Sequence, residues 1–163
     1  MAEEIFTAST ENLRDLKKQR KRICALVNRA IREKQDPDLI SLTKMYALLY
    51  SAYVETSFLK LIHTPKAFTE SEIIQIMAER NLEQKWLKCV DLAFNKLNTT
   101  NLGEVANKKQ TLHRLLQEYI IDPSQIRNKV AHGQWVYCLN NECTKVNHDT
   151  TALMANLDFV KIE

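Results

Sequence analysis

Residues 122–135 have the sequence DPSQIRNKVAHGQW, which predicts a short helix with a marked start and a marked end. Asp122 can accept hydrogen bonds from free backbone amides, and Pro123 suits a first helical turn because its missing N–H needs no partner there. Gly133 can take the left-handed conformation that ends a helix. We therefore expect a helix over residues 123–132, which is about three turns at about 3.6 residues per turn.

At about 100° per residue, four residues of this helix share one stripe that is about 140° wide. In angular order they are Arg127, Ala131, Asn128 and His132. Ile126 and Val130 lie on the far side, so the pattern predicts one polar face and one core face. The side chain of Ala131 is small enough for a substrate phosphate or a second copy of the helix to approach the backbone there.

The run Arg127-Asn128-Lys129-Val130-Ala131-His132 resembles the signature of the HEPN superfamily. That signature is an Arg, a polar residue, and a His after four to six intervening residues. Within the superfamily, the chain is most similar to the bacterial RiboL-PSP-type and MAE-type HEPN groups. This likeness rests on the extension Gly133-Gln134-Trp135 and on the upstream Tyr53-Val54-Glu55. The resemblance implies an all-α, HEPN-like antiparallel helical bundle and a metal-independent endoribonuclease that needs no cofactor.

RNA can be cut without a metal because its own 2′-hydroxyl can attack the adjacent phosphate, if the enzyme supplies proton transfer and positive charge. The resemblance implies that His132 transfers the proton and that Arg127 stabilises the phosphate. It also implies that Asn128 orients His132 or the phosphate. It also implies a homodimer in which two motif helices meet at one cleft. Taken alone, an Arg and a His near a helix end could equally pair with carboxylates and cap carbonyls.

Three further residues are expected to support this site. Glu55 is expected to be partly buried by its helical spacing, and it either holds Arg127 or tunes His132, or it is an ordinary solvated carboxylate. Lys129 points away from the polar stripe and is expected to touch the RNA backbone at the rim. Trp135 is either a core or interface residue or a ring on which a base stacks.

Nine Lys or Arg residues and two acidic residues lie between positions 14 and 34, so this segment alone exceeds the net charge of +3. Such a basic helix can neutralise phosphates and guide RNA toward a site, and Lys17, Lys18 and Lys21 are the candidates for that contact. The alternative is a merely solvated helix face, because the cations surround much of the helix.

Length and composition favour one helical domain over residues 1–163, with 45% hydrophobic residues, 2 Gly and 3 Pro. The sequence has no apolar run long enough to span a membrane and no signal peptide at its start, so we expect a cytoplasmic protein. It ends at Glu163 without a stop signal, which is compatible with further sequence in the natural protein.

Apolar periodicity and turn residues predict the other elements. The expected helices span residues 9–34 with a cap at Ser9 or Thr10, 37–63, about 69–81 with a capping box at Thr69 and Glu72, 82–97, 104–119, and a last one from near Thr150. Residues 134–139 and 142–146 are expected to form a small β-hairpin within the terminal extension 133–163.

The four cysteines, at positions 24, 89, 138 and 143, are expected to be reduced thiols. Cys138, Cys143 and His148 could be forced into a zinc site, but a fourth ligand is not evident and the spacing spans a turn, so we expect no metal.

The resemblance to the HEPN superfamily implies an endoribonuclease of a defence or toxin–antitoxin system. In HEPN toxins that pair with a nucleotidyltransferase antitoxin, the modified Tyr stands two residues after the His, where this chain has Gln134. We therefore do not expect control by that modification, and a protein antitoxin or another regulatory protein is left as the partner. One alternative is a catalytically silent HEPN-like domain that binds nucleic acid, nucleotide or protein, and another is a plain dimerisation module.

Overall fold

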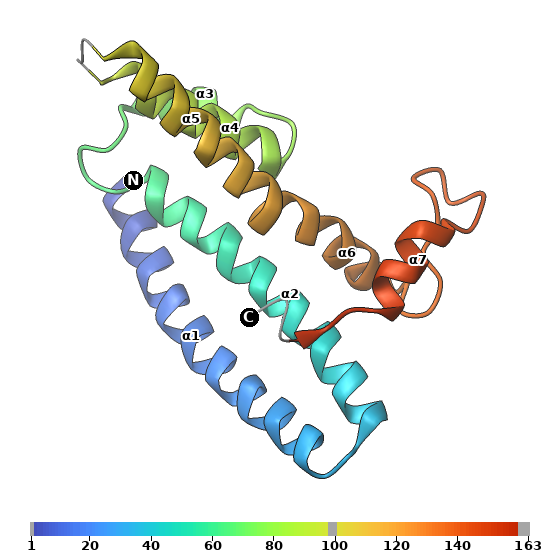
Figure 1. Ribbon diagram of the computed structural model, residues 1–163. Coiled ribbons are helices and arrows are strands. Elements are labelled where there is room, and N and C mark those ends of the chain that lie inside the picture. Colours follow the sequence, from blue (N-terminus) through green and yellow to red (C-terminus); the bar gives the residue numbers. More distant parts are fainter. Residues whose placement is uncertain (1, 98–100, 160–163) are drawn as a thin grey trace. The chain divides into compact units, whose positions relative to one another are not determined.

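The computed structural model describes residues 2–97 and 101–159. Along the chain the elements are α1 (Ala2–Arg32), α2 (Asp36–Ile62), α3 (Glu70–Met77), α4 (Leu82–Asn95), α5 (Leu102–Leu116), a π-helical segment η1 (Gln117–Ile121), α6 (Asp122–Ala131) and α7 (His148–Ala155) (Figure 1). The described part of the chain contains no strand beyond one isolated β-bridge, so the all-α class is confirmed.

Contacts divide the chain into two compact units. The first takes in the chain up to Leu13 together with Val54–Ile121, and the second takes in Arg14–Tyr53 together with the chain from Asp122 onward. The expectation of one domain over residues 1–163 stays a prediction.

The core of the first unit lies where the end of α2 packs against α3 and α4. Its most buried members are Phe58, Ile62, Ile76 and Cys89. Around them lie partly buried apolar side chains of Leu59, Phe68, Ile73, Leu82, Trp86 and Leu92. The Phe58 and Trp86 rings meet at a centroid distance of 4.9 Å. Removing this apolar surface from water is the main stabilising contribution to the unit.

The predicted capping box at the start of α3 is confirmed. The Thr69 hydroxyl accepts a hydrogen bond from the Glu72 amide at 3.3 Å, and the Glu72 carboxylate accepts one from the Thr69 amide at 2.7 Å. Lys96 forms an ion pair with the same carboxylate at 2.7 Å. This local exchange satisfies backbone amides that a helix start leaves without partners.

In the second unit α1 and α2 form a helical hairpin. Val27 and Tyr46 are buried between them, and the Tyr46 ring meets Phe159 edge-on at 4.8 Å. Helix α1 ends with Lys34 in the left-handed conformation, at a φ of 55°, while the Gln35 amide donates to the Ala30 carbonyl at 2.9 Å. This pattern is a Schellman ending in which a lysine takes the place of the usual glycine.

The predicted start of the first helix at Ser9 or Thr10 is wrong, because α1 begins at Ala2. The hydroxyls of Thr7 and Thr10 donate to the carbonyls of Glu3 and Phe6, each four residues back, at 2.9 and 2.8 Å. A hydroxyl engaged in this way continues a helix, whereas a capping hydroxyl accepts from an amide ahead of it.

The motif helix also lacks the separate start predicted at Asp122, because η1 runs into α6 with no loop residue between them. In a regular α-helix, Pro123 would remove one backbone hydrogen bond and its ring would clash with the carbonyl four residues earlier. A π-helical turn shifts the hydrogen-bond pattern by one residue, and such turns occur as short insertions in helices. The π-helical segment therefore accommodates Pro123 within a continuous helical run.

The predicted hairpin over residues 134–146 is not confirmed: in the described part of the chain its two segments meet only in one isolated antiparallel bridge, between Leu139 and Val146. The Asn140 amide donates to the Lys145 carbonyl at 2.9 Å and the Asn147 amide donates to the Cys138 carbonyl at 2.7 Å, but side chains take the neighbouring amides. The Leu139 amide donates to Gln134 Oε1 at 2.7 Å, and the Cys138 amide donates to Thr151 Oγ1 at 2.9 Å.

No helix within residues 2–97 and 101–159 is both long and apolar enough to cross a membrane.

The buried His63 makes the stability of the first unit depend on pH. Its side chain is 9% exposed, and its Nδ1 atom has no hydrogen-bond partner among the described residues. Burial lowers the pKa of His63 below its ordinary value of 6.5. The unfolded chain then binds the proton more readily, so the free energy of unfolding should fall as the pH drops through the interval between the ordinary and the lowered pKa.

Denaturant unfolding of the His63→Gln variant from neutral to mildly acidic pH should show a shallower loss of stability than the wild type. His148→Gln is the matched control, because His148 lies exposed in the first turn of α7. Equal pH dependence in wild type and His63→Gln would contradict this account.

Candidate active site

Helix α6 presents the predicted stripe to solvent and buries the opposite side. Val130 is 2% exposed and packs with Cys138 and Met154, and Ile126 adjoins the same cluster. The predicted core face of the motif helix is therefore confirmed. On the other face Asn128, Ala131 and His132 are exposed, while Arg127 is half-buried.

The C-terminal end of α6 fixes the backbone at His132. The Gly133 amide donates to the Val130 carbonyl at 3.1 Å, and the Gln134 amide donates to the Lys129 carbonyl at 2.9 Å. Gly133 itself has a φ of +77°. These are the two bonds and the left-handed residue of a Schellman motif, as expected from the sequence. His132 is thus the last residue before the turn, and its own amide donates to the Asn128 carbonyl at 3.1 Å.

Lys129 is used inside the chain. Its side chain is half-buried, and its ammonium donates to the carbonyl of Leu139 at 2.6 Å. This contact ties the loop after α6 back to the helix. An RNA contact by Lys129 would have to break this hydrogen bond, so the predicted role at the rim has a structural competitor.

Trp135 packs at the edge of the core cluster of Val130, Cys138 and Met154. Its indole N–H donates to the Val130 carbonyl at 3.0 Å, and its own carbonyl accepts from the Lys44 ammonium at 2.6 Å. The same ammonium lies 5.6 Å from the ring centroid, which is a cation–π distance. These contacts match the core alternative for Trp135, while base stacking stays a prediction.

Lys44 is the neighbour that sequence reasoning missed. It lies 91 residues from Trp135 along the chain. Lys44 stands between Thr43 and Met45 in α2, and this local sequence does not indicate a contact partner for its ammonium. Only the placement of the loop after α6 against α2 brings the two residues together, so no short-range signal could have found this contact.

The basic segment of α1 is exposed where it was expected to be. Lys17, Lys18 and Lys21 are all exposed. None of their ammonium groups forms a hydrogen bond or an ion pair with another described residue. Lys17 and Lys21, four positions apart, lie on one side of the helix, and Lys18 lies about 100° further round from Lys17.

Glu55 is half-buried on α2, as its spacing predicted. It belongs to the first compact unit, whereas Arg127 and His132 belong to the second. The predicted contact of Glu55 with Arg127 or His132 therefore stays a prediction.

The thiols at the end of the chain have different surroundings. Cys138 is fully buried beside Val130, while Cys143 is exposed with a φ of 54°. Within the described ranges, no group of three or more His, Cys, Asp or Glu side chains is placed to hold a metal ion.

Comparison of the chain with protein-family models, with curated proteins and with solved structures found no match.

Replacing Gly133 should destabilise the protein, because the turn after His132 needs a residue with a positive φ. A Cβ at this position meets no heavy atom within 4 Å, so the cost comes from the positive φ alone. We expect Gly133→Ala to lower the free energy of unfolding by about 1 kcal/mol. Denaturant unfolding measures this change.

Gly103→Ala is the control, because Gly103 lies in α5 without a positive φ and its added Cβ would meet only one atom, 3.9 Å away. This second variant should be neutral or more stable than wild type by up to about 0.5 kcal/mol. Loss of stability in both variants alike would contradict the assignment of the turn.

Proposed function

We propose that this chain is a HEPN-type, metal-independent endoribonuclease that acts as a homodimer in the cytoplasm, in a defence or toxin–antitoxin system. One observation carries the proposal. Helix α6 buries Val130 and exposes Asn128, Ala131 and His132 beside the half-buried Arg127. A candidate proton-transfer group is therefore accessible on the face of α6 that also carries the half-buried guanidinium of Arg127, and the core sets the rotation of that face.

In the proposed reaction His132 accepts the proton of an RNA 2′-hydroxyl while the 2′-oxygen attacks the adjacent phosphorus. The bond from phosphorus to the 5′-oxygen breaks, and that oxygen takes a proton from a general acid. The products are a 2′,3′-cyclic phosphate and a 5′-hydroxyl end. Arg127 supports the crowded phosphorane, since a guanidinium stays charged and matches phosphate oxygens with a planar fork. Asn128, one turn before His132, orients the imidazole or the phosphate.

The reaction needs an acid and a base at the same moment, and one imidazole cannot be both. A second copy of the chain would supply the other His132 if two α6 helices met face to face. Ala131 supports this arrangement, because it is exposed at the centre of the stripe and allows close approach of two backbones. The dimer would thus complete the active site.

RNA would approach over α1. The ammonium groups of Lys17, Lys18 and Lys21 are exposed and have no carboxylate partner in the described part of the chain, so phosphates can displace their counterions. The same observation also favours the second candidate function, a catalytically silent HEPN-like domain that binds nucleic acid through this helix. The two functions differ in whether bound RNA is cut.

Control by a protein partner such as an antitoxin fits the exposed face of α6, which a partner could cover. Gln134 stands where HEPN toxins that pair with a nucleotidyltransferase carry the modified Tyr. Its side-chain oxygen accepts the Leu139 amide at 2.7 Å, so this side chain has a structural contact in place of a modified hydroxyl.

Purified protein should cleave single-stranded RNA in excess EDTA and leave single-stranded DNA intact, because DNA lacks the attacking 2′-hydroxyl. His132→Ala should reduce the rate by at least about 100-fold, the usual scale for a general acid–base group. Arg127→Ala should also abolish cleavage, with circular dichroism reporting whether each variant keeps its helices. The cyclic phosphate end can be identified by mass spectrometry.

His148→Ala is the matched control, since it removes an exposed histidine outside the motif. Cleavage that survives in His132→Ala would contradict the nuclease. RNA binding without cleavage by the wild-type dimer would favour the silent domain.

Bulk at position 131 should separate the two copies. We expect Ala131→Arg to convert the dimer to a monomer and to abolish RNA cleavage, because the new side chain would occupy the space between the two helices. Light scattering coupled to size-exclusion chromatography measures the mass. Ala106→Arg, at an exposed alanine of α5, should remain dimeric and active. A dimeric, active Ala131→Arg variant would contradict the face-to-face arrangement.

A further inference from the structure

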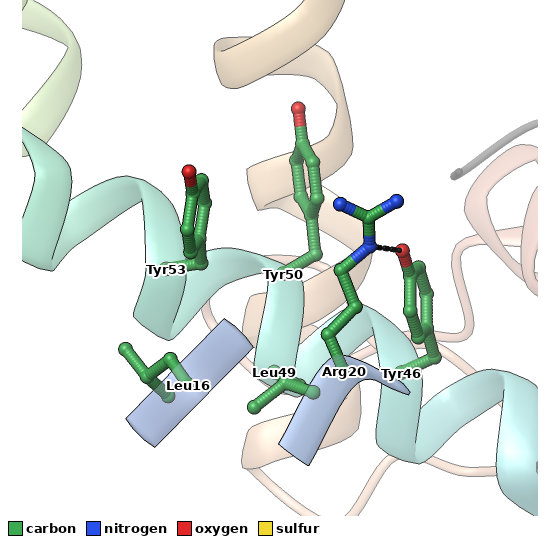
Figure 2. Close-up of a pocket in the computed structure, with 6 residues that line it drawn as sticks. All are labelled: Leu16, Arg20, Tyr46, Leu49, Tyr50 and Tyr53. Carbon is green, nitrogen blue, oxygen red and sulfur yellow. Dashed lines mark hydrogen bonds between the residues drawn. The ribbon is translucent and has the colours of Figure 1, made fainter. Parts of the chain in front are cut away.

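A small hollow lies between α1 and α2 of the second unit, away from the motif residues in sequence. Figure 2 shows the residues that line it: Leu16, Arg20, Tyr46, Leu49, Tyr50 and Tyr53. Its cavity volume is about 60 Å³, which is room for part of one planar ring and far too little to enclose a large cofactor. None of the described residues that line it carries a carboxylate.

The lining combines aromatic rings with one cation. Tyr50 and Tyr53 stand side by side on α2 with their hydroxyls pointing the same way, and Leu16 and Leu49 form the apolar base (Figure 2). The exposed Arg20 reaches across from α1, and its Nε donates to the Tyr46 hydroxyl at 3.1 Å. This bond holds the guanidinium at the rim beside the rings. Burial raises the pKa of Tyr50, so its hydroxyl stays neutral.

Two exposed lysines of α1 lie on one side of the hollow. On the α1 helix, Leu16 and Arg20 define the stripe that lines the hollow, and Lys17 and Lys21 each follow it by about 100°. The opposite flank of the same stripe carries Asp15 and Gln19, and the Gln19 amide donates to the Asp15 carboxylate at 3.2 Å. A ligand whose ring enters the hollow would therefore have its anionic groups next to a row of exposed ammonium groups.

We propose that this hollow is a binding subsite for one unpaired base of an RNA strand, with the base against the rings of Tyr50 and Tyr53 and the flanking phosphates on Arg20, Lys17 and Lys21. Aromatic side chains combined with a cationic groove are the usual means of holding single strands, because every base has a π-face. The inference rests on the proposed function in taking RNA as the ligand. It adds a second contact point, on α1 and α2, that selects single-stranded over paired RNA.

The test uses the His132→Ala protein, so that the probe is not cut. Fluorescence anisotropy compares a short fluorescein-labelled oligouridylate with a probe of the same length and backbone that lacks the bases. The subsite predicts that the protein binds the base-free probe about tenfold more weakly, which is within the range for loss of one stacked base. Equal binding of both probes, or of neither, would overturn the subsite.

Two pairs of variants locate the effect. Tyr50→Leu should weaken oligouridylate binding about tenfold and Tyr50→Phe should not, because phenylalanine keeps the ring. Arg20→Ala should weaken binding more than Arg22→Ala does, although each removes one exposed arginine of α1. Arg22 is the matched control, since its Nη1 contacts Gln19 and it lies about 160° round the helix from Arg20. Arg20 is exposed, so Arg20→Ala remains informative if Tyr50→Leu unfolds, and circular dichroism shows whether losing its bond to the buried Tyr46 hydroxyl alters the helices.

Equal effects of Arg20→Ala and Arg22→Ala, together with full binding by Tyr50→Leu, would overturn the subsite and leave only a diffuse electrostatic surface. The outcome is independent of catalysis. A wild-type protein that cuts RNA but binds both probes equally would retain the nuclease and lose the subsite. A protein that shows base-dependent binding at Tyr50 without any cleavage would retain the subsite and lose the nuclease.

Discussion

The packing of Val130 against Cys138 and Met154 determines which face of α6 the solvent reaches. Val130 is 2% exposed, so rotating the helix to bury the polar stripe would bring this apolar side chain into water and strand polar groups in the core. Helical geometry then leaves no choice for Asn128, Ala131 and His132, which fall outside. The proposed chemistry depends on this one apolar contact as much as on the residues that would carry it out.

The loop after α6 is held mainly by polar side chains reaching backbone groups, in place of a β-ladder. Lys129 and Lys44 each donate to a loop carbonyl at 2.6 Å, and Gln134 accepts a loop amide at 2.7 Å. Each of these bonds satisfies a backbone group that would otherwise be costly to cover. The loop can therefore stay irregular and still close over the buried face of α6.

Sequence reasoning succeeded at several local signals and failed where a distant partner or a competing local hydrogen bond decided the outcome. The exchange between Thr69 and Glu72 spans three residues, and Gly133 ends its helix by its own conformational freedom, so both could be predicted. The hairpin could not be excluded from alternating residues alone, because its competitor for the Cys138 amide, Thr151, lies 13 residues away in α7. Leu26 falls on the apolar seam of α1 by its spacing from Ile23 and Ala30, yet it is 49% exposed, because periodicity locates a face and not its edge.

The lysines of this chain serve two physical purposes that net charge cannot distinguish. The ammonium groups of Lys44 and Lys129 are bound to carbonyls, and their removal would leave partly buried oxygen atoms without these donors. Lys17 and Lys21 are exposed and have no such partner within the described residues, so they contribute little to the free energy of folding. A loss of RNA affinity on replacing the second pair would therefore report on binding itself, whereas the same loss on replacing the first pair would mix binding with folding. The exposed part of α1 is for this reason the place where an RNA-binding role can be measured separately from stability.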